Sequence, residues 1–138
     1  MTVFLLDTNV VSEMRRSRPH GAVAAWLRST DHRLLRVSAF SLGEIQAGIE
    51  LTRDQDPGRA AELERWADEV ERIYELLPMD AEIWRAWAKL MHRKSDTLAD
   101  DARIAATAVV HELVVVTRNV RDFQPFKVQT FNPFAASS

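Results

Sequence analysis

Segments that favour β-strands alternate along this chain with segments of helical periodicity, and this alternation restricts the fold more than any other feature. Strands are predicted for Val3–Leu6, Leu34–Val37, Leu76–Pro78, Leu113–Val116 and Lys127–Thr130. Helices are predicted from about Asn9, over Ala22–Arg28, from Ser38 or Ser41 to Leu51, over Arg59–Tyr74, after Asp80 and over Asp100–His111. Such alternation is typical of a parallel sheet covered on both faces. We predict a single α/β domain over residues 1–138, a three-layer α/β/α sandwich with a mainly parallel sheet.

Composition excludes several kinds of site. The chain has no cysteine, so disulfides, thiolate zinc sites and cysteine nucleophiles are impossible. The formal net charge of −2 gives no overall basic surface that would indicate nucleic-acid binding. The N-terminal segment does not resemble a signal peptide, and no apolar run approaches the roughly 20 residues of a membrane helix. We therefore expect a soluble, cytoplasmic protein without membrane contact.

Acidic residues recur where the predicted sheet would bind a ligand. Asp7 directly follows the first strand, Glu44 lies in the first turn of the helix after the second strand, and Asp122 follows the Leu113–Val116 strand. The carboxyl ends of parallel strands lie at one edge, where open α/β sheets bind ligands. Asp7, Glu44 and the loop over residues 117–122 are therefore predicted to lie together.

Asp100 and Asp101 open the helix that precedes a strand, so sheet geometry alone does not bring them to this edge. They reach it only if their helix crosses the mouth of the site. Each acid also has a purely structural interpretation. Asp7 can cap the first helix, Glu44 can form a capping box with Ser41, and first-turn acids favour a helix N-terminus.

Carboxylates held together repel one another unless a cation lies between them or some are protonated. Oxygen ligands without thiolates suit Mg²⁺ or Mn²⁺. A metal of this kind acidifies a bound water and neutralises charge on a phosphate, so the pattern indicates metal-assisted phosphodiester hydrolysis.

Four segments, in order along the chain, resemble the motifs of PIN-domain ribonucleases. They are Leu5–Glu13, Ser38–Ile45 with Gly48, Asp101–Ala108 and Val116–Phe123. Phe131–Phe134 is similar to the ending of the FitB-like subgroup. The resemblance implies a Mg²⁺- or Mn²⁺-dependent endoribonuclease, the VapC-type toxin of a toxin–antitoxin pair. It also implies an RNA substrate, a homodimer and a cognate antitoxin that blocks the acidic site, with an antitoxin guanidinium inserted among the acids.

Carried over onto this sequence, Asp7, Glu44 and Asp101 match the metal-binding acids of the family. The fourth acid of the family often directly follows Thr-Arg, where this chain has Asn119. Asn119 can offer a carbonyl oxygen or orient a water, whereas Asp122 can supply the missing carboxylate. The remaining polar residues of these motifs, Thr8 and Thr117, are expected to hydrogen-bond to the ligands or to contact the attacking water.

Basic and aromatic residues allow two interpretations each. Arg15 and Arg16 follow the first helix and Arg118 lies in the fourth motif, where they can contact RNA phosphates or form a solvated surface. Trp26, Trp66 and Trp87 fit apolar helix faces and are predicted to lie in the core. Trp84 lies at the edge of its apolar stripe, where it can join the core or form a dimer or antitoxin surface.

Two other functions fit parts of the pattern. A strand followed by Asp7 is also found in aspartyl-type phosphatases, but those enzymes need a second Asp where this chain has Asn9. No Gly-rich phosphate loop compensates. The second alternative is a catalytically impaired interaction module with the same fold, which remains possible because Asn119 replaces the fourth acid.

Overall fold

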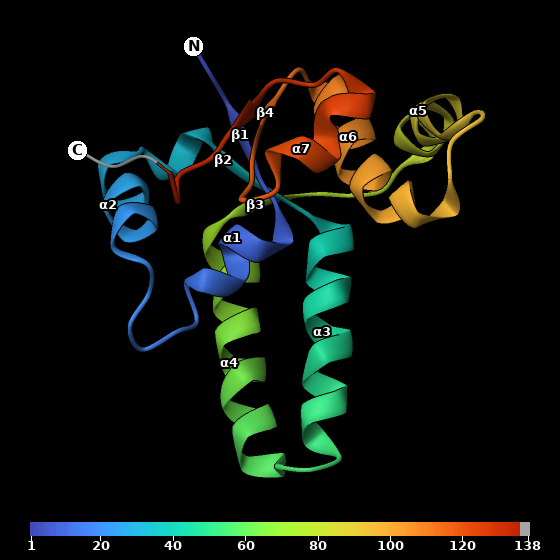
Figure 1. The fold of residues 1–138 in the computed structure, drawn as a ribbon. Coiled ribbons are helices and arrows are strands. Elements are labelled where there is room, and N and C mark those ends of the chain that lie inside the picture. Colours follow the sequence, from blue (N-terminus) through green and yellow to red (C-terminus); the bar gives the residue numbers. More distant parts are fainter. Residues whose placement is uncertain (136–138) are drawn as a thin grey trace.

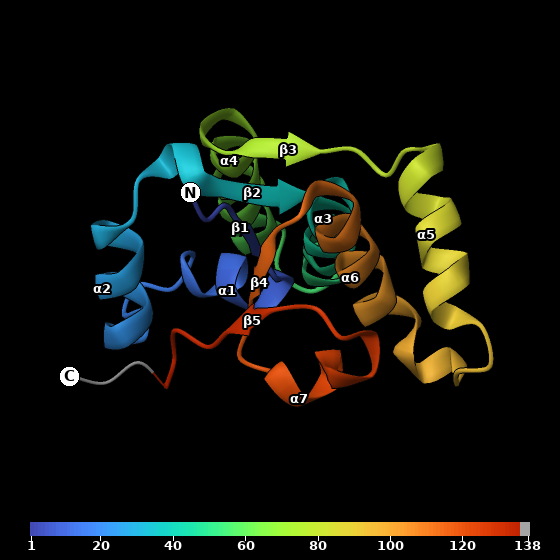
Figure 2. The ribbon, with the colours of Figure 1, turned by 90° about the horizontal axis from the view of Figure 1, so that it is seen from above.

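The fold is built on a sheet of five parallel strands, seen in the computed structural model of residues 1–135 (Figure 2). Residues 136–138, the end of the predicted domain, lie outside the described residues. The strands are β1 (Phe4–Leu6), β2 (Leu35–Ser38), β3 (Glu75–Leu77), β4 (Val114–Val116) and β5 (Thr130–Phe131). They lie in the order β3-β2-β1-β4-β5, and β1 pairs with both β2 and β4. The predicted parallel sheet is confirmed.

Helices cover both faces of this sheet (Figures 1 and 2). They are α1 (Thr8–Glu13), α2 (Gly21–Ser29), α3 (Ala39–Arg53), α4 (Pro57–Ile73), α5 (Ala81–Met91), α6 (Ala99–His111) and α7 (Val120–Phe123). Short 3-10 turns lie at His32–Leu34, Asp96–Leu98 and Gln124–Phe126. No helix among the described residues combines the length and apolarity that a membrane span requires.

Alternating side chains of the strands divide the core into two clusters. Leu6 and Val116 pack with the apolar faces of α1, α2, α3 and α4. Leu5 and Val115 point the other way and pack with α5, α6 and α7. Because successive strand residues face opposite sides, strands buried on both faces must be apolar throughout. This explains the continuous apolar runs and confirms the predicted three-layer sandwich.

Helices α3 and α4 form a long hairpin that extends away from the sheet (Figure 1). Ile45 and Ile49 of α3 are buried, as are Ala67 and Val70 of α4. Near the end of the hairpin, Arg53 Nη2 lies 2.7 Å from Glu64 Oε1. This ion pair links the projecting parts of α3 and α4, while Glu44 lies toward the other end of the hairpin, in the second turn of α3.

One predicted cap is confirmed, whereas another cap and a strand boundary were wrong. Asp7 caps α1, which begins at Thr8, and its carboxylate accepts from Thr8 N at 2.8 Å. Ser38 caps α3, with its hydroxyl accepting from Phe40 N at 3.0 Å, so the predicted capping box of Ser41 and Glu44 does not form. Strand β5 lies at Thr130–Phe131 because Lys127 adopts a left-handed conformation that ends a turn there.

Candidate metal centre

Asp7 is the most enclosed of the predicted site residues. Only 7% of its surface is exposed, at the end of β1, where its backbone N–H donates to Val116 O. Its carboxylate accepts from Thr117 Oγ1 at 2.8 Å and from Asn9 Nδ2 at 3.2 Å. Burial raises the pKa of Asp7, although these hydrogen bonds and the one from Thr8 oppose the shift. Asp7 therefore caps α1 and also presents a fixed carboxylate at the sheet edge.

Glu44 reaches the same edge from the second turn of α3. Its Oε1 accepts from Thr8 Oγ1 at 2.6 Å, and Thr8 Oγ1 also lies 2.8 Å from Ser41 Oγ. Half-burial raises the pKa of Glu44, and the charges of Asp100 and Asp7 raise it further. Thr8 thus connects the first motif to the second and holds Glu44 beside Asp7.

Asp101 joins these acids from the first turn of α6. Burial raises its pKa to about 6, with further contributions from the charges of Asp7, Asp122, Asp100 and Glu44. Asp7, Glu44, Asp100 and Asp101 line one hollow, where their negative charges oppose one another's ionisation. Helix α6 therefore brings its N-terminus to the mouth of the site, as the prediction for Asp101 required.

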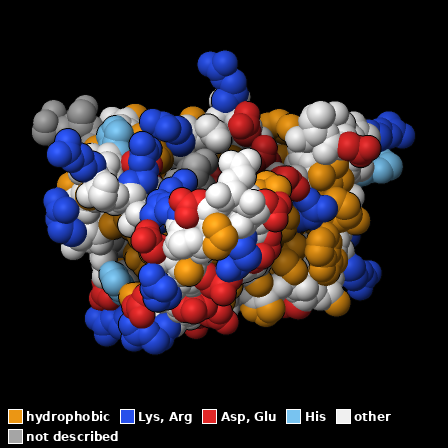
Figure 3. All heavy atoms as spheres, turned by 90° about the horizontal axis from the view of Figure 1, so that it is seen from below, with side chains coloured by type: hydrophobic (Ala, Val, Ile, Leu, Met, Phe, Trp, Pro, Cys, Tyr) orange, Lys and Arg blue, Asp and Glu red, His pale blue; other side chains and the backbone are white. Residues whose placement is uncertain are grey.

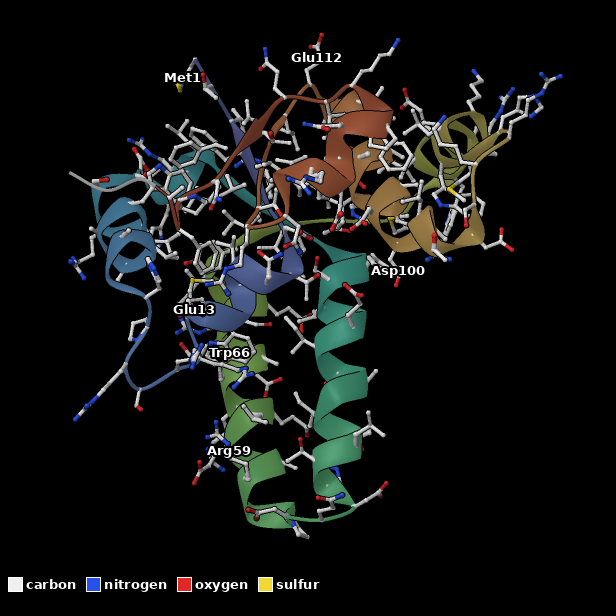
Figure 4. All side chains as sticks on the ribbon, viewed as in Figure 1. Met1, Glu13, Arg59, Trp66, Asp100 and Glu112 are labelled. Carbon is white, nitrogen blue, oxygen red and sulfur yellow. The ribbon has the colours of Figure 1, made fainter. Side chains whose placement is uncertain are left out.

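Asp7, Glu44 and Asp101 line one hollow of about 310 Å³ at the carboxyl edge of the sheet. Its other lining residues are Thr8, Asn9, Ser12, Phe40, Asp100, Ile104 and Asn119. Figure 4 shows Asp100 beside the upper end of α3, where this hollow lies. Three elements far apart in the sequence thus direct carboxylates into the same space.

Asn119 and Asp122 occupy different places. Asn119 lines the hollow, and its backbone N–H donates to Thr117 Oγ1 at 3.0 Å. Asp122 is exposed on α7 and does not line the hollow, although its charge raises the pKa of Asp101. The geometry favours Asn119 over Asp122 as the fourth polar group at the site.

The donors around the hollow fit a hard divalent cation. All of them are oxygen atoms of carboxylates, hydroxyls and amides, which are the ligands that Mg²⁺ and Mn²⁺ prefer. Within residues 1–135, no three Asp, Glu or His side chains gather closely enough to surround a metal ion. Asp7, Glu44 and Asp101 would therefore share a cation partly through its waters, of which Mg²⁺ usually keeps several.

The three predicted RNA-binding arginines have different neighbours. Arg15 borders a neighbouring groove together with Thr8 and Glu44. Arg16 pairs with Glu13 at 3.4 Å at the end of α1. Arg118 places its guanidinium 4.3 Å from the Phe134 ring centroid. Of the three, Arg15 lies on the surface that continues directly from the acids.

Two polar groups have roles that the sequence did not indicate. Asn9 donates to Asp7 and accepts from Arg118 N at 3.3 Å, so it fastens the loop after β4 to the first motif. Ser41 contacts Thr8 instead of capping its helix. The partner of Asn9 lies 109 residues away, and no local pattern could have revealed it.

Comparisons with known proteins find relatives over nearly the whole chain. A PIN domain profile matches residues 4–127. The chain is 32% identical to Toxin FitB of Neisseria gonorrhoeae, over 96% of this chain and 99% of that protein. It is 30% identical to VapC ribonuclease Y4jK of Sinorhizobium fredii, over 96% and 98% of the two chains. A structure of FitAB bound to an IR36 DNA fragment superposes with a TM-score of 0.85, at 31% identity and 99% coverage of both chains. This chain belongs to the PIN domain family.

Proposed function

We propose that this chain is a metal-dependent endoribonuclease and the toxin of a type II toxin–antitoxin pair. The observation that carries the proposal is the convergence of Asp7, Glu44 and Asp101, from three separate elements, on one hollow where their pKa values are raised. Similarity to a named toxin and to a named ribonuclease over nearly the whole chain supports it.

Asp7, Glu44 and Asp101 would hold Mg²⁺ or Mn²⁺, which when bound supplies an acidified water and neutralises charge on the phosphate. The chain's own hydrogen bonds preorganise these acids. Thr117 and Asn9 fix the orientation of the Asp7 carboxylate, and Thr8 fixes that of Glu44. Without metal, burial and the neighbouring acids raise the pKa of Asp101, and a bound cation would favour its ionised form.

The test is cleavage of a mixed structured RNA with Mg²⁺, with Mn²⁺ and with EDTA. Asp7→Asn is compared with Asp68→Asn, which changes an exposed carboxylate on α4. We expect cleavage that requires metal, is lost in Asp7→Asn and persists in Asp68→Asn. Wild-type protein that neither cleaves RNA nor binds Mn²⁺ would contradict the proposal and favour an impaired interaction module, with Asn119 as its cause.

We also propose that an antitoxin occupies the groove between α1, α3 and α4. This groove of about 310 Å³ adjoins the acids through Thr8 and Glu44 and has an apolar wall that includes Leu63 and Trp66. Trp66 and Arg59 both project from α4 (Figure 4). Co-purification with the protein encoded beside it, and inhibition of cleavage by that protein, test the pairing. Sedimentation of the free toxin tests the expected homodimer.

A further inference from the structure

Arg103 has surroundings that the proposed metal site does not use. Its guanidinium carbon lies 5.1 Å from the Phe40 ring centroid, 5.4 Å from that of Trp87 and 5.7 Å from that of Trp84. Its side chain keeps 24% of its surface exposed and pairs with Asp100. We call Phe40, Trp84, Trp87 and Arg103 the aromatic–arginine cluster.

This cluster forms one lip of the acidic hollow. Phe40 and Asp100 line the hollow, while Arg103 contacts both of them from outside it. The charge of Arg103 also partly offsets the increase in the pKa of Glu44. A strand of RNA that placed a phosphate in the hollow would meet this cluster at the adjacent nucleotide.

The two tryptophans of the cluster differ in what they do for the fold. Trp87 is half-buried, and its Nε1–H donates to Ala99 O at 3.1 Å, which ties α5 to the start of α6. Trp84 packs edge-on against Trp87 at 5.4 Å and leaves 41% of its surface exposed. Figure 3 shows hydrophobic side chains gathered on the side of the molecule where α5 lies. Trp84 therefore contributes little to the core, and its indole surface is open beside the acidic hollow.

We propose that Trp84 and Arg103 bind the nucleotide next to the scissile phosphate of a single-stranded RNA, with the base stacked on Trp84 and the guanidinium on a backbone phosphate. The proposal rests on the proposed ribonuclease function. Base stacking on aromatic rings beside a cation is how proteins bind single strands without reading their sequence. The cluster supplies both parts at the edge of the acidic hollow.

An RNA occupant accounts for the charge better than a protein occupant does. Aromatic and arginine side chains also occur together in protein interfaces, but here the guanidinium borders the acidic hollow, where a phosphate of the substrate would offer it a charged partner. Asp100 keeps Arg103 oriented toward the hollow in the free protein. The apolar depression between α5 and α6, lined by Leu90, Val109 and Val110, lies alongside and is the surface that a second protein would use instead.

The experiment measures RNA binding separately from hydrolysis. All variants are made in an Asp7→Asn background, and fluorescence anisotropy follows labelled single-stranded oligoadenylate and an abasic oligomer with the same number of phosphates. Trp84→Ala is expected to weaken oligoadenylate binding about 5- to 150-fold and to leave abasic binding unchanged. Trp84→Phe is expected to retain most of the affinity.

Arg103 is tested through the salt dependence of binding. Arg103→Gln is expected to weaken both oligomers and to reduce the salt slope by about 0.7, the loss of one phosphate contact on a single strand. Ile73→Ala, a change at a side chain 46% exposed near the end of α4, is the matched control and should alter neither. Thermal melting of each variant confirms that it is folded.

The outcomes separate this proposal from the function on which it rests. Trp84-dependent binding of oligoadenylate supports the subsite even if the wild type cleaves no RNA. An unchanged oligoadenylate affinity when Trp84→Ala is added to Asp7→Asn, together with metal-dependent cleavage at an unchanged KM by Trp84→Ala in the otherwise wild-type protein, overturns the subsite and leaves the nuclease intact. The subsite is also overturned if the Asp7→Asn protein, with Trp84 and Arg103 intact, binds oligoadenylate no more tightly than the abasic oligomer. A change in oligomeric state without a change in RNA affinity assigns Trp84 to a protein interface instead.

Discussion

Thr117 Oγ1 donates a 2.8 Å hydrogen bond to Asp7 Oδ2 across 110 residues of sequence, and both side chains are buried. This contact joins the ends of β1 and β4, which are neighbours in the sheet. It satisfies a carboxylate that burial would otherwise penalise. The same hydrogen bond thus serves the fold and orients the first acid of the site.

Thr117→Val should reduce cleavage about 10- to 100-fold and destabilise the protein by about 1–3 kcal/mol, because it leaves the buried Asp7 Oδ2 with only its longer hydrogen bond from Asn9. The pKa of Asp7 should rise further, so the loss of activity should be greater at pH 6 than at pH 8. Rate measurements across this range, with urea unfolding at each pH, test the prediction. Thr117→Ser keeps the hydroxyl and should restore most activity; equal defects in the two variants would show that packing matters more than the hydrogen bond.

Metal-free protein should lose stability as the pH rises from about 4 to 6. Asp101 has a folded-state pKa of about 6 against an ordinary value of 3.8, so the folded state binds more protons than the unfolded state in this window. Above the window the penalty is constant. Mg²⁺ should offset it, and the melting temperature at pH 7.5 should rise when the metal is added.

Asp101→Asn removes the charge that causes this penalty. The variant should be more stable than the wild type without metal at pH 7.5, by roughly 1 kcal/mol once solvent screening is allowed for, and the difference should vanish near pH 4. Calorimetry in EDTA at several pH values measures it. If the stability difference between Asp101→Asn and the wild type stays constant with pH, titration of Asp101 does not cause it.

Asn119→Asp should strengthen Mn²⁺ binding about tenfold, because it adds a carboxylate to a group that already lines the hollow. It should also destabilise the metal-free protein at neutral pH through like-charge repulsion. Asp122→Asn, on the exposed face of α7, should change Mn²⁺ affinity less than Asn119→Ala does. Titration calorimetry of the three variants distinguishes the positions, and a larger loss in Asp122→Asn would reverse our assignment of the fourth group.

The sequence predicted the parts of the fold that local patterns determine. The apolar runs of β1 and β4 are buried on both faces, and their composition reflects that burial directly. Boundaries at caps were less predictable, because Ser38 and Ser41 offer the same hydroxyl and only the packed structure decides which one caps α3.

The positions of the site residues were likewise predictable only where local patterns determine them. Strand ends placed Asp7 correctly, and the second motif placed Glu44 near it, but nothing in sheet geometry required Asp101 to reach the same hollow. That outcome depends on how α5 and α6 pack, which joins residues from different parts of the chain. The contact between Arg103 and Phe40 is of the same kind and was not predicted.

The central claim is that Asp7, Glu44 and Asp101 bind one divalent cation between them, directly or through its waters. The most direct measurement is Mn²⁺ binding at pH 7.5, by titration with electron paramagnetic resonance, to the wild type and to Asp7→Asn, Glu44→Gln, Asp101→Asn and Asp68→Asn. We predict that each of the first three variants weakens Mn²⁺ binding at least about tenfold and that Asp68→Asn binds as the wild type does. Wild-type affinity in all of the first three variants would contradict the account.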